Sequence, residues 1–264
     1  MTATSNPATN QTTLAVIRRF NRFELKYLAD RDLVRAFRAD LPDHLARDAN
    51  GFNGFYPVWS LYYDTRDLHC YWEKIDGERF RRKLRIRHYG PPSAATDSSP
   101  VWVEIKQRVN RVTQKRRVQL TYEEARKLCS GHEPADHSDR DTIFIEEVLT
   151  FAGERQLRPT TVVGYVREAF VGLEEDSGLR LTIDSRVRAR DRDLEIGVDS
   201  ENRFIVPPRL SIVEVKVNER IPYWLTELIA RHNLSLIRVS KYCQSIEAFD
   251  RAPRSMFQPA LSEL

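Results

Sequence analysis

The sequence predicts an antiparallel α+β fold whose sheet carries one strongly charged face. Charged residues alternate with apolar ones in several short segments, for example residues 23–27 and 81–87. Successive side chains of a strand point to opposite faces, so each segment presents one apolar and one charged face. Helical signals are few and do not follow each strand in turn. This order favours an antiparallel sheet over a parallel, doubly wound one.

Strands are predicted wherever this alternation is strong. The segments are residues 23–27, 81–87, 103–106, 115–117, 180–186 and 213–216. Residues 90–100 are rich in Gly, Pro and Ser and predict a long hairpin connection between two of these strands. A second polar loop is expected over residues 131–141, and Pro207-Pro208 marks a third break.

Helices are predicted over residues 29–41, 121–129, 141–153, 222–232 and 240–249. Thr121 and Glu124 have the spacing of a capping box. Pro222 suits the first turn of a helix, and Ser240 is a good N-cap.

Length and composition predict one large domain. The chain has 264 residues, 41% of them hydrophobic and 30% charged, and we find no boundary within it. We expect the domain to span residues 14–252, with terminal tails over 1–13 and 253–264. No window approaches 18 consecutive apolar residues, so no transmembrane segment is expected. The three cysteines form no Cys-x-x-Cys motif, which favours a reducing cytoplasm and gives no support to a zinc site.

The predicted charged face is much more basic than the chain as a whole, whose net charge is only +4. We place 13 cations on it: Lys26, Arg81, Lys83, Arg85, Arg87, Lys106, Lys115, Arg117, Arg167, Arg180, Arg186, Lys216 and Lys241. Four carboxylates accompany them: Glu24, Glu104, Asp184 and Glu214. A general nucleic-acid binder is usually basic over its whole surface, so no nucleic-acid partner is expected.

Two arrangements of this face remain open. In a sheet covered on one side, the charged face simply meets water. Residues 79–87, however, would place like charges side by side, which is unfavourable unless an anion neutralises them. If the sheet closed into a barrel, its charged face would point inward and line a polar lumen. Arginine forks bind phosphate oxygens, and carboxylates in such a lumen suit Mg²⁺ or Mn²⁺, or else salt bridges to their basic neighbours.

A series of motifs gives the chain a family likeness over about residues 18–249. The motifs occupy residues 22–27, 62–64, 80–89, 103–106, 115–117, 165–169, 181–186, 213–216 and 240–242. In their order and spacing they resemble the VTC domain, the polyphosphate polymerase domain of the vacuolar transporter chaperone complex. That domain belongs to the triphosphate tunnel metalloenzyme (CYTH-like) superfamily.

The resemblance implies a closed, eight-stranded antiparallel tunnel with helices outside and a lining that grips a triphosphate or polyphosphate. It implies catalytic roles for Lys26, Arg85, Arg87, Lys106, Arg167 and Arg186. It also matches Lys115 and Lys241 to phosphate-binding lysines and Glu214 to the ligand of Mn²⁺ or Mg²⁺. The alternating pattern adds Arg81, Lys83, Arg117, Arg180 and Lys216 as phosphate ligands, and Glu24 and Glu104 as metal ligands. Ser240, which precedes Lys241 in the terminal Ser-Lys-Tyr motif, is a further expected phosphate ligand.

One departure bears on the expected reaction. The hydrolytic branch carries Glu-x-Glu-x-Lys on its first strand, whereas this chain has Arg22 at the first position. This favours a polyphosphate polymerase that uses ATP over the first alternative, a tripolyphosphatase or nucleoside triphosphatase. A non-catalytic polyphosphate-binding module remains open as a second alternative.

Overall fold

The structure, a computed structural model, describes residues 23–41, 45–110, 112–132, 138–218 and 220–253. The tails expected over residues 1–13 and 253–264 lie outside this part of the chain, apart from Pro253, and so does Arg22. The strands are β1 (Phe23–Asp30), β2 (Leu45–Arg47), β3 (Phe55–Asp64), β4 (Phe80–Tyr89), β5 (Pro100–Val109), β6 (Val112–Thr121), β7 (Arg158–Gly172), β8 (Arg180–Arg190), β9 (Arg203–Phe204), β10 (Leu210–Val217) and β11 (Ser235–Leu236). The α-helices are α2 (Arg31–Ala39), α3 (His69–Ile75), α4 (Tyr122–Cys129), α5 (Thr142–Arg155), α6 (Tyr223–Arg231) and α7 (Lys241–Ala248), and the 3₁₀ turns are η1 (Pro92–Ala94) and η2 (Glu174–Asp176).

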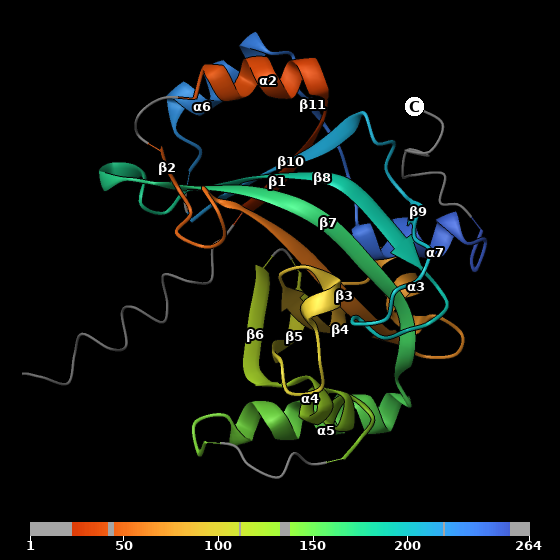
Figure 1. Cartoon of the computed structure of the whole chain (residues 1–264). Coiled ribbons are helices and arrows are strands. Elements are labelled where there is room, and N and C mark those ends of the chain that lie inside the picture. The colour runs from red at the N-terminus through yellow and green to blue at the C-terminus, as the bar shows by residue number, and fades with distance from the viewer. Residues whose placement is uncertain (1–22, 42–44, 111, 133–137, 219, 254–264) are drawn as a thin grey trace, which may run out of the picture.

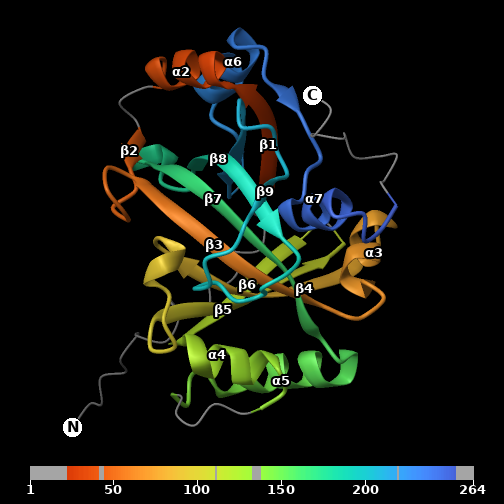
Figure 2. The ribbon, with the colours of Figure 1, turned by 45° about the vertical axis from the view of Figure 1, so that its right-hand side comes forward.

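All of the strands belong to one antiparallel sheet that curls without closing (Figures 1 and 2). Its main path is β11-β1-β10-β8-β7-β3-β4-β5-β6, with β2 paired to β7 and β9 paired to β8. The α+β class is confirmed, but the expected closed, eight-stranded barrel is wrong. The sheet has 11 strands, and among the described residues no backbone ladder joins β6 to β1 or β11. The edge of β1 that would complete the ring is taken in part by β11.

The outer, convex face of the sheet is apolar and is covered by helices at two opposite ends of the fold (Figure 1). Leu84, Ile86 and Val103 pack in one cluster with residues of α4 and α5, such as Leu128 and Phe151. A second cluster places Val213 and Val215 of β10 with Phe37 of α2 and Leu225 of α6. The prediction of helices outside the sheet is therefore confirmed for α2, α4, α5 and α6.

The inner, concave face is charged over much of its area and apolar where α7 packs. Tyr242, Cys243 and Ile246 of this helix share a buried cluster with Val187 and Ala189 of β8. Helix α7 also lies beside α3 (Figure 2). We call the space enclosed by the concave face the lumen; α7 fills part of it.

The five predicted helices are present, with ends shifted by a few residues. Thr121 and Glu124 form the capping box of α4, and the Ser240 hydroxyl accepts a hydrogen bond from the Cys243 N–H at the start of α7. Helix α3 was not predicted. It depends on the buried Asp64 carboxylate at the end of β3, which accepts the N–H groups of Cys70 and Tyr71 six and seven residues later and so caps the helix. None of the described helices has the length and apolar character needed to cross a membrane.

Candidate functional site

The alternation of β4 carries through to the folded chain. Leu84 and Ile86 are fully buried on the outer face, while Lys83, Arg85 and Arg87 point into the lumen. The same rule applies to β5, where Ile105 packs outside and Glu104 faces inward. The predicted cations meet their carboxylates in three groups within the lumen.

The first group surrounds Glu104, whose side chain is fully buried. Arg85 donates two hydrogen bonds to Glu104 Oε2, from Nε at 2.9 Å and from Nη2 at 2.6 Å. Lys115 Nζ lies 3.0 Å from Oε1, and Arg87 Nη1 lies 3.8 Å from Oε2. Burial raises the pKa of Glu104, but the charges of Arg85, Arg87 and Lys115 outweigh it and hold the pKa well below its usual range. Glu104 therefore stays ionised and fixes three cations.

The second group is centred on Asp184, which is also fully buried. Arg167 donates from Nε and Nη2 to its two oxygens at 2.7 and 2.8 Å, a bidentate pair. Lys241 of α7 donates to Oδ2 at 2.6 Å. Burial raises the pKa of Asp184, yet the charges of Arg167 and Lys241 lower it well below the usual range. This carboxylate thus ties the last helix to the sheet.

The third group joins β1, β10 and β5. Lys26 Nζ lies 3.1 Å from Glu24 and 3.8 Å from Glu214, and Lys216 pairs with Glu214. Glu24 also accepts a hydrogen bond of 2.9 Å from Lys106 Nζ on β5. The pKa of Lys216 is well below its usual value, mainly because the side chain is buried.

A divalent ion would find its best donors in this third group. Among the described residues, no three His, Cys, Asp or Glu side chains gather closely enough to form a complete ligand set. Glu24 and Glu214 do converge on Lys26, and two carboxylates suit Mg²⁺ or Mn²⁺ when phosphate and water complete the shell. Glu104 does not join them, because three cations already occupy its oxygens.

The other predicted phosphate ligands are spread around these groups. Lys83 donates to the Ser240 hydroxyl at 3.1 Å, which places both residues beside α7. Arg180 pairs with Asp48 at 2.5 Å, and Arg81 donates to the carbonyl oxygen of Glu78, just before β4. Arg117 is exposed and stacks on Trp102, with 3.9 Å between Cζ and the ring centroid.

Arg186 is the one predicted lumen cation that the structure places on the outer face. At the β7–β8 pairing, Arg186 and Val187 together lie opposite the single residue Tyr165. This bulge reverses the alternation, so Val187 packs inward and Arg186 lies outside, with Cζ 6.0 Å from the Phe204 ring centroid. Arg186 has φ +53°, a left-handed conformation that costs about 1–3 kcal/mol in a residue other than glycine. Period-two reasoning does not detect such a bulge.

Sequence reasoning also missed the neutral groups that orient the arginines. Arg87 donates to the Ser60 hydroxyl at 3.1 Å and to the Tyr165 hydroxyl at 3.2 Å. Arg85 donates to the Tyr62 hydroxyl at 3.0 Å. Burial raises the pKa of Tyr62, but Arg85 and Arg87 outweigh it and lower the pKa to about 8. The signal was present in β3, where Ser60 and Tyr62 alternate with the outward-facing Trp59 and Leu61.

Lys74 of α3 is a further basic residue that the strand pattern did not reveal. Burial, followed by the charge of Arg81, lowers the pKa of Lys74 to about 8. The charges of Lys83 and Lys26 lower the pKa of Lys74 as well, so the cations of the lumen disfavour the protonated form of Lys74.

The chain was compared with known proteins and protein families. Solved structures that resemble the chain include a candidate adenylate cyclase from Bacillus halodurans, with 15% identity, 87% of this chain and 98% of that chain covered, and a TM-score of 0.48. A protein of Pyrococcus horikoshii matches at 14% identity, 86% and 99% coverage and a TM-score of 0.44. A candidate adenylate cyclase from Vibrio parahaemolyticus matches at 12% identity, 85% and 97% coverage and a TM-score of 0.42. No curated protein matches the chain significantly. The profile of the VTC domain matches residues 21–250, nearly the whole chain, and the chain therefore belongs to the VTC domain family.

Proposed function

We propose that this chain is a metal-dependent phosphotransferase of the polyphosphate polymerase type, which binds ATP and polyphosphate in its lumen. The observation that carries the proposal is the convergence of cations from six strands and one helix on a few inward carboxylates. Membership of the VTC domain family supports the same assignment.

The balance of charge favours a polyanionic ligand. Eight cations take part in the three ion-paired groups: Lys26, Arg85, Arg87, Lys106, Lys115, Arg167, Lys216 and Lys241. Only four carboxylates oppose them: Glu24, Glu104, Asp184 and Glu214. Each uncompensated cation would attract a phosphate oxygen about 4 Å away by roughly 4 kcal/mol at an effective dielectric near 20. A chain of phosphates supplies several such charges at once.

Phosphoryl transfer requires correct positioning of the substrates and does not require a covalent nucleophile from the protein. Phosphoryl transfer proceeds by in-line displacement, and catalysis consists mainly of alignment and neutralisation of charge. Arg85 and Arg87 are held in place by Glu104, Tyr62 and Ser60, so their forks are fixed before a substrate binds. Mn²⁺ or Mg²⁺, held by Glu24 and Glu214, would supply Lewis-acid neutralisation of phosphate oxygens.

The direct test is chain synthesis by the purified protein from ATP and Mn²⁺, followed with a polyphosphate dye. Arg87→Ala and Glu214→Gln should each abolish the signal. The matched control is Arg192→Gln, since Arg192 is exposed and pairs with the exposed Glu201. Synthesis that continues unchanged in both lumen variants would refute the proposal, and release of phosphate without chain growth would select a hydrolase instead.

One observation favours a second candidate, a polyphosphate-binding module without catalysis. The carboxylates of the described lumen are already paired with lysine or arginine, and no three-ligand metal group is present there. Binding of polyphosphate that persists in a metal chelator, with no turnover of ATP, would support this module.

A further inference from the structure

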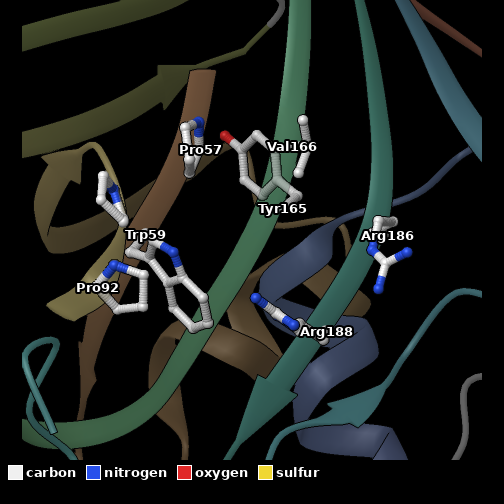
Figure 3. A pocket seen from close by; sticks show the side chains of 8 residues that line it. Pro57, Trp59, Pro92, Tyr165, Val166, Arg186 and Arg188 are labelled. Atoms are coloured by element: carbon white, nitrogen blue, oxygen red, sulfur yellow. The ribbon is translucent and has the colours of Figure 1, made fainter. Parts of the chain in front are cut away.

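A second pair of arginines lies on the outer face of the sheet. Arg186 and Arg188 of β8 line a pocket of about 180 Å³, together with Pro57, Trp59, Pro91, Pro92, Tyr165 and Val166 (Figure 3). We call this the outer pocket. In Figure 3 the Arg188 side chain reaches toward the Trp59 ring, and Arg186 projects from another point of the same strand.

These two cations lack the carboxylate partners that the lumen provides. Within the described residues, neither Arg186 nor Arg188 forms an ion pair or donates a hydrogen bond, and no acidic residue lines the outer pocket. Their contacts are to aromatic rings, with Arg188 Cζ 5.0 Å from the Trp59 centroid and Arg186 Cζ 6.0 Å from the Phe204 centroid. Burial and the neighbouring charge of Arg186 both lower the pKa of Arg188, so the two cations repel each other.

The pocket is built on rigid parts of the fold. Trp59 is only 2% exposed and lies across Gly164, where an added Cβ would meet the ring at 2.6 Å. The bulge that turns Arg186 outward also places its backbone in the left-handed region. Strain of this kind persists where the surrounding structure fixes it, and it is common at ligand sites. Two guanidinium groups from successive outward positions of β8 thus line this hollow without a carboxylate partner among the described residues.

From these contacts we propose that the outer pocket is a second anion site, which binds a phosphate oxyanion between Arg186 and Arg188. Planar guanidinium forks match phosphate oxygens, and a bound dianion would remove the repulsion between the two cations. The volume of 180 Å³ lies below the range of about 300–1,000 Å³ typical of pockets for drug-sized ligands. A free phosphate, or the terminal group of a phosphate chain, therefore fits better than a whole nucleotide.

The proposal of an anion site in the outer pocket does not depend on the proposed catalytic function. Tyr165 lines the outer pocket, while its hydroxyl accepts a hydrogen bond from Arg87 in the lumen. Binding at the two sites must therefore be measured on separate variants.

The test is isothermal titration calorimetry of the full chain without metal, using orthophosphate and then tripolyphosphate. Four proteins are compared: the wild type, Arg186→Gln/Arg188→Gln, the lumen variant Arg85→Gln/Arg87→Gln, and the surface control Arg192→Gln. Loss of charge-assisted hydrogen bonds should weaken outer-site binding by about tenfold or more in the first variant, and the lumen variant should keep this binding. Orthophosphate binding identifies free phosphate as the ligand; binding of tripolyphosphate alone identifies a chain terminus.

Equal affinity in the wild type and the outer-pocket variant, for both ligands, would overturn the proposal. No binding outside the lumen in the wild type would do the same. Arg186→Gln alone serves if the double variant melts at a lower temperature, because Arg186 is exposed and its side chain supports no buried contact. NMR gives an independent measurement. The indole N–H resonance of Trp59, assigned by its loss in Trp59→Phe, should shift when phosphate is added to the lumen variant.

Discussion

Lys106 on β5 and Glu24 on β1 form an ion pair of 2.9 Å across the line where the curled sheet fails to close. No backbone ladder joins the two described ends of the sheet there. Glu24 also contacts Lys26, so this carboxylate links opposite walls of the lumen. We call the gap between β6 and β1 the seam; this ion pair crosses it from β5, the strand next to β6.

Removing the seam carboxylate should weaken the fold only slightly. Lys106 is 40% exposed and Glu24 is 22% exposed, so solvent screens their attraction. We expect Glu24→Gln to lower the free energy of unfolding by about 1 kcal/mol or less in urea titrations without ligand. The control Glu201→Gln should give a value near zero. A loss as large as that of a buried charge pair would show that the seam is shielded from water.

Asp184 should matter far more for stability. It is fully buried and holds Arg167 and Lys241, so Asp184→Asn leaves two cations without their counter-ion. We expect a loss of about 3–5 kcal/mol in the free energy of unfolding, measured by urea titration. Saturating tripolyphosphate should restore part of it, since phosphate can replace the missing charge. Asp32→Asn, at an exposed pair with Arg35, is the control and should change little.

Acid should destabilise the protein through its buried carboxylates. The pKa values of Glu104 and Asp184 are lower in the folded chain than the unfolded values of about 4.3 and 3.9. Their contribution is therefore complete above about pH 4–5 and is lost as the pH falls through the folded values. Urea unfolding at a series of pH values should show this decline, with a shallower slope in Glu104→Gln. An identical slope in that variant would contradict the ion pairs around Glu104.

Tyr62 should titrate close to neutral pH. Its pKa is lowered to about 8 because Arg85 and Arg87 outweigh the effect of burial. The ultraviolet absorbance of tyrosinate should therefore show one residue ionising near pH 8, and Tyr62→Phe should remove that step. Added polyphosphate should move the step to higher pH, since bound anion offsets the arginine charges. A first ionisation near 10 in the ligand-free wild type would disprove the contact with Arg85.

Two glycines should respond to alanine in opposite directions. At Gly164 a new Cβ would meet the Trp59 ring at 2.6 Å, so Gly164→Ala should destabilise the fold by about 1–3 kcal/mol. At Gly153, in α5, nothing lies within 4 Å, and Gly153→Ala should stabilise it by about 0.5–1 kcal/mol. Thermal melting of both variants gives the comparison. Equal effects would mean that Trp59 does not lie across β7.

The sequence predicted well those features that depend on local periodicity. Lys83, Arg85 and Arg87 share a face because a strand repeats every two residues, and the capping box of α4 is read from Thr121 and Glu124. These relationships need no knowledge of distant parts of the chain.

Features that depend on distant contacts could not be read in this way. The outward position of Arg186 results from the bulge opposite Tyr165, and the open seam results from how the sheet's two ends meet. Likewise the bond between Arg85 and Tyr62 depends on the pairing of β3 with β4. Helix α3 was missed for a different, local reason: Asp64 accepts backbone N–H groups six and seven residues later, and helix propensities do not include such a contact.

The pairing of β1 with β10 has a consequence for biosynthesis. Strand β1 can pair with β10 only after β10 has been synthesised, and Lys241 can pair with Asp184 only after α7 has been synthesised. A ribosome-bound chain lacking these segments holds Arg167 beside Asp184 but leaves Glu24 and Lys26 without Glu214. Contacts between segments so distant in sequence slow folding, so the lumen is completed only after β10 and α7 have been synthesised.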